Sequence, residues 1–409
     1  MLRYLVLIFA IFPFTQILPL GTYNQPYAFL TGLLTLLFFP RVYSALPQLD
    51  RLMLAYLGLL GLVMFLLIAI DGPSVREVQY LLVYVSPAVI VPALVAVMIN
   101  HTKSARRILT AGILIWIAVA LVQRLIAPGF LVSLTTGDAD LATNILASGR
   151  GQLGLAPEPT HHGLHLLAMG AALMMLRGSV WVVGLAFASA LLLALSSFAA
   201  LMLMVAVVIW AVLRPWRWPG LVLGFSGTTL FLNYGTLLFN EGTRLGSLLR
   251  VLQTEGVNVL MSDASTNARV FGIISPIAES ARGFFAPLGM GYDAWIEMSR
   301  VIIQNNPSIF FLSGAGPASG YGLILVQAGF FSFPFLYYVF KRLCLAQAGT
   351  WRGLAVIVGF TTFIGQIYLS TPSFSLVMAT AITAVLLRHD KGSQSDESDN
   401  ALSRSVVGT

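Results

Sequence analysis

Apolar stretches long enough to cross a membrane recur along almost the whole chain, from Leu2 to Leu387. A helix needs about 20 mainly apolar residues to cross the hydrocarbon layer of a bilayer. The 409 residues are 57% hydrophobic and only 10% charged, whereas soluble domains carry about 25% charged residues. The sequence therefore predicts an all-α polytopic membrane protein, with a single integral membrane domain over residues 1–387.

Hydropathy predicts about 12 transmembrane helices. The predicted spans are residues 2–20, 27–40, 51–70, 79–99, 106–127, 163–176, 179–195, 198–213, 218–238, 316–340, 351–369 and 371–387. The first stretch has one early basic residue and no small-residue cleavage site, so we expect a retained span rather than a signal peptide.

The distribution of charge predicts the orientation of the spans. With a cytoplasmic N-terminus, the inside segments hold 15 basic and five acidic residues, and the outside segments hold eight basic and 11 acidic residues. The resulting charges of +10 and −3 account for the formal +7 of the chain and satisfy the positive-inside rule. Both termini are therefore predicted to be cytoplasmic, and the Ser- and Asp-rich tail, residues 388–409, is expected to be disordered.

Two large periplasmic loops are predicted on the outside, about 128–162 and about 239–315, and both are much longer than the other connections. Long loops that contain structure are usually functional. Apolar residues with helical spacing in the second loop predict amphipathic helices at the outer membrane surface. These residues are Leu245, Leu248, Leu249 and Leu252, followed by Val270, Ile273, Ile274 and Ile277.

The end of the first loop, residues 149–165, is the densest polar cluster of the chain. Ionisable groups at the edge of a membrane are costly and are functional candidates by default. Glu158 lies between two prolines, which fix the backbone and hold the carboxylate in place, as a general base requires. A compatible alternative is a helix start with Thr160 as N-cap and Glu158 favouring the helix dipole.

Three of the five histidines lie beside Glu158, which raises the alternative of a metal site. They are His161, His162 and His165. No complete ligand signature is present, so histidines hydrogen-bonded within the helix bundle are favoured, and no metal or cofactor is predicted. The only cysteine, Cys344, excludes an internal disulfide. No motif indicates ATP or nucleic acid.

Arginines in both outside loops are suited to bind phosphate, because the guanidinium group makes bidentate contacts with it. Arg150 is the only Lys or Arg of the first loop, and the second contains Arg244, Arg250, Arg269, Arg282 and Arg300. Arg244 and Arg250 are expected only to anchor an amphipathic helix to anionic lipid. Arg269 is the better candidate, because it follows a helix-start cluster and precedes a Pro- and Gly-rich turn at 287–292 whose glycines allow close backbone approach.

An arginine followed by Gly-Leu-x-x-Glu-Pro-Thr at the start of a membrane helix, and a later outside loop with Arg269 and Pro-x-Gly-x-Gly, resemble the O-antigen polymerase and O-antigen ligase family. The resemblance implies a glycosyltransferase of the bacterial inner membrane that uses no nucleotide sugar and no cofactor. It would transfer a glycan from undecaprenyl diphosphate onto a lipid-linked repeat unit at the periplasmic face. A chain-length regulator and a lipid-linked-glycan flippase are implied as partners beside the bilayer and the lipid-linked oligosaccharide.

The resemblance also implies a role for each matching residue. The implied catalytic residues are Glu158, His161 and His162, the implied diphosphate-binding residues are Arg150, Arg269 and Arg282, and the implied loop supports are Gly289, Gly291 and Tyr292. Glu158 is favoured as the base that deprotonates the acceptor hydroxyl, because it matches the motif.

Two departures from the family pattern separate its branches. Some polymerases carry Arg-x15-Gly in both large loops, whereas here 12 residues separate Arg150 from Gly163 and 19 separate Arg269 from Gly289. The ligase branch is expected to carry a histidine in the second large loop, and residues 239–315 contain none. The histidine criterion favours polymerase over ligase.

Other classes of membrane protein fit the sequence less well. A solute transporter would show internal repeats and charged or broken segments near the bilayer midplane, but no repeat relates the two halves and the polar residues concentrate outside. A peptidoglycan-type polymerase of the shape and division family does not explain the Glu-Pro-Thr segment. A metallohydrolase needs the histidines to bind metal.

Overall fold

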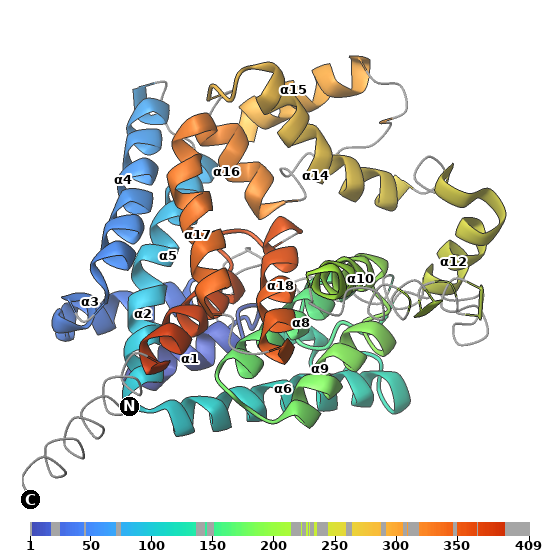
Figure 1. Ribbon diagram of the computed structural model, residues 1–409, viewed down its shortest axis with the longest axis horizontal. Coiled ribbons are helices and arrows are strands. Elements are labelled where there is room, and N and C mark those ends of the chain that lie inside the picture. The colour runs from blue at the N-terminus through green and yellow to red at the C-terminus, as the bar shows by residue number, and fades with distance from the viewer. Residues whose placement is uncertain are drawn as a thin grey trace, which may run out of the picture.

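The computed structural model of the chain (Figure 1) describes most of its length. The described residues are 2–17, 25–44, 46–70, 75–135, 144, 151–213, 222, 226–227, 229, 233–234, 244–258, 264–287, 292–305, 309, 319–346, 350–365 and 367–388. Every regular element in these residues is a helix and none is a strand. The predicted all-α fold class is confirmed for this part of the chain.

Helices occupy nearly all of the predicted spans. The first half contains α1 (Leu2–Ile11), α2 (Tyr27–Phe38), α3 (Arg41–Ser44), α4 (Gln48–Ile70), α5 (Val75–Asn100), α6 (Thr102–Leu125) and η1 (Val132–Leu134). The second half contains α8 (Pro159–Met175), α9 (Val180–Leu192), α10 (Ser197–Val212), α12 (Arg244–Glu255), η2 (Gly256–Asn258), α14 (Ala264–Arg282), α15 (Tyr292–Asn305), α16 (Gly320–Ala328), η3 (Gly329–Ser332), α17 (Phe333–Ala346), α18 (Thr350–Ile364) and a C-terminal helix, Pro372–Arg388. The predicted span 218–238 and the tail after Arg388 lie outside the described residues, apart from isolated positions of the former.

Four helical stretches in the described chain are long and apolar enough to cross a membrane: Gln48–Leu66, Leu82–Asn100, Thr102–Leu125 and Gly320–Ala346. The last of these runs through α16, η3 and α17. In Figure 1, α4 and α5 run upright whereas α6 runs across the lower edge, so the helices do not form a simple parallel bundle. The total of about 12 spans stays a prediction.

The first predicted span, 2–20, does not form one continuous helix. α1 is 10 residues long and ends at Ile11, two residues before Pro13. Proline disfavours the helical conformation of the preceding residue and has no N–H to continue the helix. The chain turns there instead, and the N–H of Gln25 donates to the carbonyl of Pro13 at 2.8 Å.

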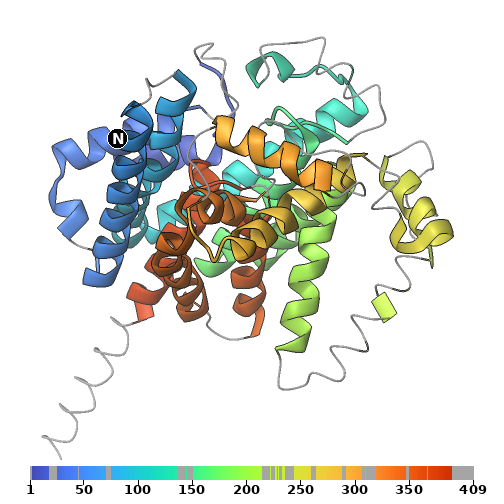
Figure 2. The same cartoon turned by 90° about the horizontal axis from the view of Figure 1, so that it is seen from above.

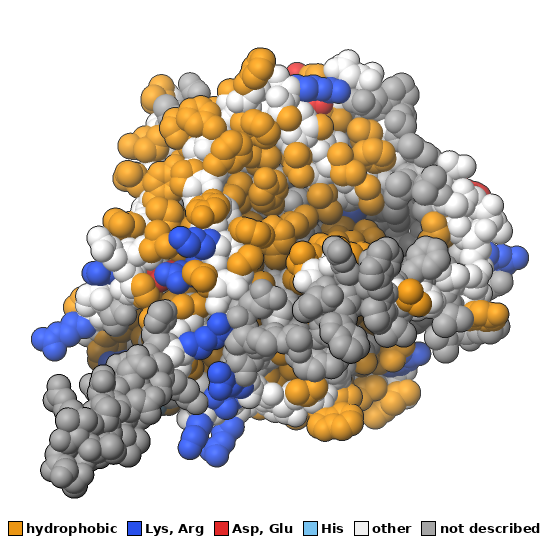
Figure 3. Space-filling view, in the orientation of Figure 1, with side chains coloured by type: hydrophobic (Ala, Val, Ile, Leu, Met, Phe, Trp, Pro, Cys, Tyr) orange, Lys and Arg blue, Asp and Glu red, His pale blue; other side chains and the backbone are white. Residues whose placement is uncertain are grey.

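Segments predicted to lie inside meet one another at one end of the molecule. The guanidinium of Arg3 lies 3.9 Å from the ring centroid of Phe39, and the rings of Tyr4 and His101 are 5.6 Å apart. Figure 3 shows Lys and Arg side chains gathered at the lower left, below an apolar surface over α4 and α17. This arrangement agrees with the charge sorting, and the cytoplasmic side itself stays a prediction.

A buried ion pair joins α4 to α17. The carboxylate of Asp50 is fully buried and receives two hydrogen bonds from the guanidinium of Arg342, at 2.6 and 2.5 Å. The hydroxyl of Tyr338 donates a third, at 2.7 Å. A bidentate arginine with a further donor is the geometry that best offsets the desolvation of a buried carboxylate.

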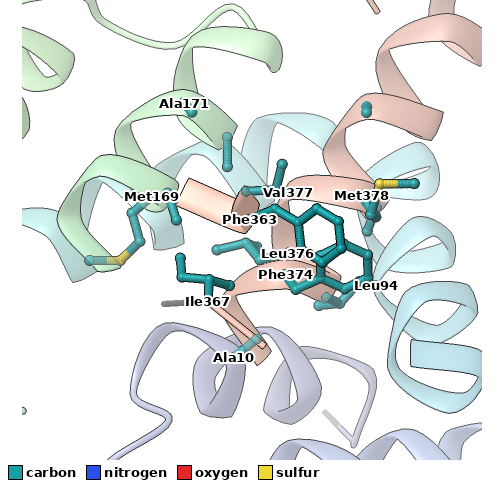
Figure 4. Packing of buried hydrophobic residues seen from close by; sticks show 14 of the residues in the cluster. Ala10, Leu94, Met169, Ala171, Phe363, Ile367, Phe374, Leu376, Val377 and Met378 are labelled. Atoms are coloured by element: carbon teal, nitrogen blue, oxygen red, sulfur yellow. The ribbon is translucent and has the colours of Figure 1, made fainter. Parts of the chain in front are cut away.

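α8 lies at the centre of the apolar core. All of its residues are buried except His161 and Met174. Figure 4 shows Met169 and Ala171 of α8 near Phe363 of α18 and Phe374 of the C-terminal helix. Because neighbouring helices enclose α8, its N-terminal end is held in a fixed position.

The predicted amphipathic helices of the second outside loop exist as α12 and α14. Seen from above (Figure 2), α14 and α15 lie across the bundle and α12 lies at its edge. In α14, Ile274 and Ile277 of the predicted apolar stripe are exposed, at 52% and 37%. Small residues such as Ser275 and Ser280 are buried instead. The apolar stripe is thus left partly on the surface, as a helix lying along a membrane requires.

Candidate functional site

The polar segment before α8 folds into the bundle rather than over its surface. Residues 151–158 are buried except Gln152 and Glu158, which are half-buried. The N–H of Gln152 donates to the carbonyl of Leu193 at 2.8 Å. A Cβ at Gly151 would lie 1.9 Å from the carbonyl oxygen of Ala194, so only glycine fits there. The turn between α9 and α10 therefore fixes the start of this segment.

Gly151→Ala is expected to destabilise the protein by about 1–3 kcal/mol, because the added methyl group collides with backbone rather than with a flexible side chain. Thermal unfolding of the purified protein in detergent measures the effect. The control is Gly184→Ala in α9, where a Cβ would meet nothing within 4 Å; the added helix propensity should raise stability by about 0.5–1 kcal/mol. Equal unfolding temperatures for the two variants would contradict the tight packing.

A glutamine of α6 holds the next part of the segment. The side-chain amide of Gln123 donates to the carbonyls of Gly154 and Phe130, both at 2.9 Å, and its oxygen accepts from the N–H of Gly154 at 2.8 Å. Gly154 has φ +58°, and a Cβ there would lie 3.0 Å from the ring of His162. The motif glycine is thus required twice, by backbone conformation and by close packing. The sequence reasoning missed Gln123, although a polar side chain within an apolar run is a signal of function.

Two of the three histidines are buried and hydrogen-bonded within the bundle, as predicted. His165 donates from Nε2 to the carbonyl of Ile11 at 2.8 Å and accepts at Nδ1 from the hydroxyl of Ser373 at 2.6 Å. His162 donates from Nδ1 to the carbonyl of Gln152 at 2.8 Å. Both nitrogens of His165 are therefore engaged, and no group of three or more described His, Cys, Asp or Glu residues is placed to share a metal ion.

The ring of His162 stacks on Trp116 of α6, with centroids 5.6 Å apart. Its Nε2 is buried without a hydrogen-bond partner in the described residues. A buried polar atom of this kind calls for an explanation by function, but full burial keeps His162 away from any acceptor approaching from the surface. His162 is therefore a weaker candidate base than its neighbours.

α8 begins at Pro159, not after a threonine cap. Glu158 is the N-cap in an extended conformation, φ −141° and ψ 151°. Thr160 lies inside the helix, so the interpretation of Thr160 as N-cap is wrong. Proline is favoured at the first helical position because its φ is already helical, and this fixes the start one residue earlier. The half-buried carboxylate of Glu158 lies where the helix dipole favours negative charge.

Glu158 and Arg269 both lie near enough to His161, in the first turn of α8, for their charges to act on it, and we refer to the three residues as the Glu–His–Arg cluster. Burial lowers the pKa of His161, the nearby Glu158 carboxylate raises it, and the Arg269 guanidinium lowers it again. The guanidinium also lies 5.7 Å from the ring centroid of Phe198 at the start of α10. Phe14 forms another wall, with its ring 5.6 Å from that of His161. A carboxylate and an imidazole from the first predicted outside loop thus lie near a guanidinium from the second, and a guanidinium is a group that binds phosphate.

Of the other predicted site residues on the second outside loop, Arg282 is described and is not brought to this cluster. Arg282 lies 13 residues after Arg269 on α14, about 20 Å along the helix axis. It is 63% exposed and pairs with Glu279 at 2.5 Å. Arg150, Gly289 and Gly291 fall outside the described residues, and Tyr292 is described only as the first residue of α15.

Cross-linking tests the approach of α14 to α8. In a Cys344→Ser background, His161→Cys with Arg269→Cys is expected to react with a short bifunctional thiol reagent, because both side chains belong to one cluster. The matched control, His161→Cys with Arg282→Cys, uses the far end of the same helix and should not cross-link. The cross-link is read by mass spectrometry of the digested protein, and equal yields for the two pairs would contradict the geometry.

Comparison of the chain with protein-family models, with curated proteins and with solved structures gives no match in any of the three.

Proposed function

We propose that the protein is a membrane glycosyltransferase that polymerises a surface polysaccharide from glycans linked to undecaprenyl diphosphate, at the outer face of the bacterial inner membrane. The observation that carries the proposal is the Glu–His–Arg cluster, which unites one residue of the Glu-Pro-Thr motif with the favoured arginine of the second loop. The many apolar helices agree with a substrate presented from the bilayer.

The chemistry divides between the acidic and the basic residue. The acceptor hydroxyl attacks the anomeric carbon of the donor glycan, and its proton passes to the Glu158 carboxylate. The bond between that carbon and the diphosphate oxygen breaks, and its electron pair leaves with the lipid diphosphate. Arg269 stabilises the charge that develops there. In this scheme His161 is the alternative base, and Arg150 is a second diphosphate ligand by the resemblance alone.

The cluster is suited to this work by its position and its surroundings. Glu158 and His161 lie on a helix end fixed by Gln123 and by the α9–α10 turn. A general base and a charge-stabilising group are effective when they are held in place before the reaction. Aromatic rings flank the cluster, with Phe14 beside His161 and Phe198 beside the Arg269 guanidinium. An apolar neighbour strengthens the attraction of a guanidinium for a phosphate oxygen.

Deletion of the gene in its native host, with surface glycans and lipid-linked intermediates separated by size, tests the proposal. If the protein is a polymerase, the deletion strain should contain single repeat units in place of long chains, and the wild-type gene should restore the long chains. Long chains that accumulate on the lipid carrier would indicate a ligase instead. An unchanged profile of both glycans and lipid intermediates would refute glycan transfer and favour a solute or polysaccharide transporter.

A further inference from the structure

A shallow groove lies between the first turns of α6 and the turn that joins α8 to α9. Its basic lining residues are Arg106, Arg107 and Arg177, and we refer to it as the arginine groove. Arg388 lies near enough to Arg177 for the two positive charges to repel. Among the described residues, no carboxylate forms an ion pair with any of the three lining arginines. The groove is thus positively charged, and an anion from outside the protein fits it.

Backbone strain marks one of these arginines. Arg177 has φ +63°, in the left-handed region that favours glycine. It follows the C-cap Leu176, at the position where helices usually carry glycine, and the glycine of this turn comes one residue later, at Gly178. Strained residues of this kind cluster at functional sites. A glycine at 177 would relax the backbone but would remove one guanidinium from the groove.

The lining of the groove changes from charged to apolar along α6. Arg107, Thr110, Ala111 and Leu114 share one face of that helix and all line the groove, which extends about 10 Å from the first of them to the last. Leu114 is 44% exposed. An amphiphile with an anionic head and an apolar chain matches this gradient better than a free anion does.

The opposite wall has the same character. Ser179, the N-cap of α9, lines the groove and its side chain makes no capping hydrogen bond. The next two residues, Val180 and Trp181, are 71% and 86% exposed. Tryptophan is enriched at the boundary between headgroups and acyl chains, so this wall also belongs at the membrane–water interface.

The groove is separate from the Glu–His–Arg cluster. Arg177 follows the C-terminal end of α8, whereas Glu158 precedes its N-terminal end. The 17 residues of α8 place the two sites about 25 Å apart along the helix. The lipid-linked donor of the proposed reaction therefore does not account for the groove.

We propose that the arginine groove binds an anionic phospholipid from the leaflet at the N-terminal end of α6, with the phosphate held by the three arginines and an acyl chain lying along α6. Arginine is the side chain best suited to bidentate contact with phosphate. A zwitterionic lipid carries a compensating cation in its headgroup, so its net attraction to the groove is weaker. The proposal is independent of the proposed glycan transfer.

Native mass spectrometry of the full-length protein in detergent tests the proposal, with short-chain phosphatidylglycerol and short-chain phosphatidylcholine as probes. The wild-type protein is expected to bind phosphatidylglycerol more tightly than phosphatidylcholine. Each arginine contributes on the order of fivefold in affinity, so Arg106→Gln/Arg107→Gln/Arg177→Gln should lose on the order of 100-fold. The single variant Arg107→Gln, on an exposed position, should lose about fivefold even if the triple variant does not fold.

A matched control removes three arginines elsewhere, on α3, at the C-terminal end of α6 and on α15: Arg41→Gln/Arg124→Gln/Arg300→Gln. These three residues are exposed. Their replacement should leave unchanged the affinity of the protein for its most tightly bound molecule of phosphatidylglycerol. Equal losses in the two triple variants, or equal affinity for the two lipids, would overturn the proposal. Displacement by inorganic phosphate at the concentration of the lipid would assign the groove to a free anion. Tighter lipid binding after removal of residues 389–409 would mean that the acidic tail of the protein, rather than a lipid, occupies the groove.

Discussion

Replacing Arg269 by alanine is expected to slow glycan transfer about 100- to 1,000-fold, the usual effect of removing one group that stabilises developing charge. The guanidinium lies beside His161 and Phe198, where it meets the departing diphosphate in the proposed reaction. Arg269→Lys keeps the charge but loses the bidentate contact, so its rate should fall between those of wild type and the alanine variant. The measurement is the initial rate of polymer formation from lipid-linked repeat units in purified membranes.

Three further variants sharpen this test. Glu158→Gln preserves the size of the side chain and removes the base. Its rate of polymer formation should fall at least as far as that of Arg269→Ala. His161→Gln separates the two candidate bases. A small loss of rate in this variant, together with a large loss in Glu158→Gln, would assign proton transfer to the carboxylate. Arg300→Ala is the matched control: this arginine is 68% exposed and pairs with Glu297 on α15. Wild-type rates for Arg269→Ala at equal expression would rule out its role at the diphosphate.

Replacing Arg342 by methionine is expected to destabilise the protein by about 3–5 kcal/mol, because it leaves the fully buried carboxylate of Asp50 without its charged partner. Tyr338 would remain as the side-chain donor to this carboxylate. The effect is measured by thermal or denaturant unfolding of the protein in detergent. Tyr338→Phe removes a single hydrogen bond to a charged group and should cost about 1.5–3 kcal/mol.

A double variant distinguishes loss of a buried pair from loss of packing. Asp50→Ala combined with Arg342→Met removes both charges without overfilling the buried site, and replacement of a buried ion pair by apolar groups is often neutral or stabilising. The double variant should therefore regain most of the stability lost by Arg342→Met. Additive losses in the double variant would mean that shape, rather than the buried charge, determines the stability of this contact.

Local patterns predicted the helices well. Spans such as 79–99 and 106–127 were identifiable because hydropathy is a property of neighbouring residues, and α5 and α6 occupy them with shifts of a few residues. Pro13 is also a local signal, yet the apolar residues around it outweighed it in the prediction of a span over 2–20. The partly exposed stripe of α14 was predictable as amphipathic. Its contact with α16, where Gly322 packs against Pro276 of α14, was not.

Contacts between distant segments were beyond such patterns. Glu158 was predictable from its flanking prolines, whereas the approach of Arg269, 111 positions later in the sequence, depends on how α14 crosses the bundle. Asp50 and Arg342 lie just outside the predicted spans 51–70 and 316–340, and no local pattern pairs them. Gln123 stood unremarked in an apolar run, because its partner is backbone, which has no sequence signature. These residues became meaningful only once the helices were packed.

The ion pair between α4 and α17 also has a consequence for biosynthesis. Its two residues are 292 positions apart, and ribosomes add about 5–20 residues per second. Asp50 is therefore made roughly 15–60 s before Arg342 exists. During that interval its carboxylate has to stay in the headgroup region or carry a proton, because a lone charge is not stable in hydrocarbon. The last third of the chain thus completes the insertion of the first, and a protein truncated before α17 should be recognised by membrane quality-control proteases.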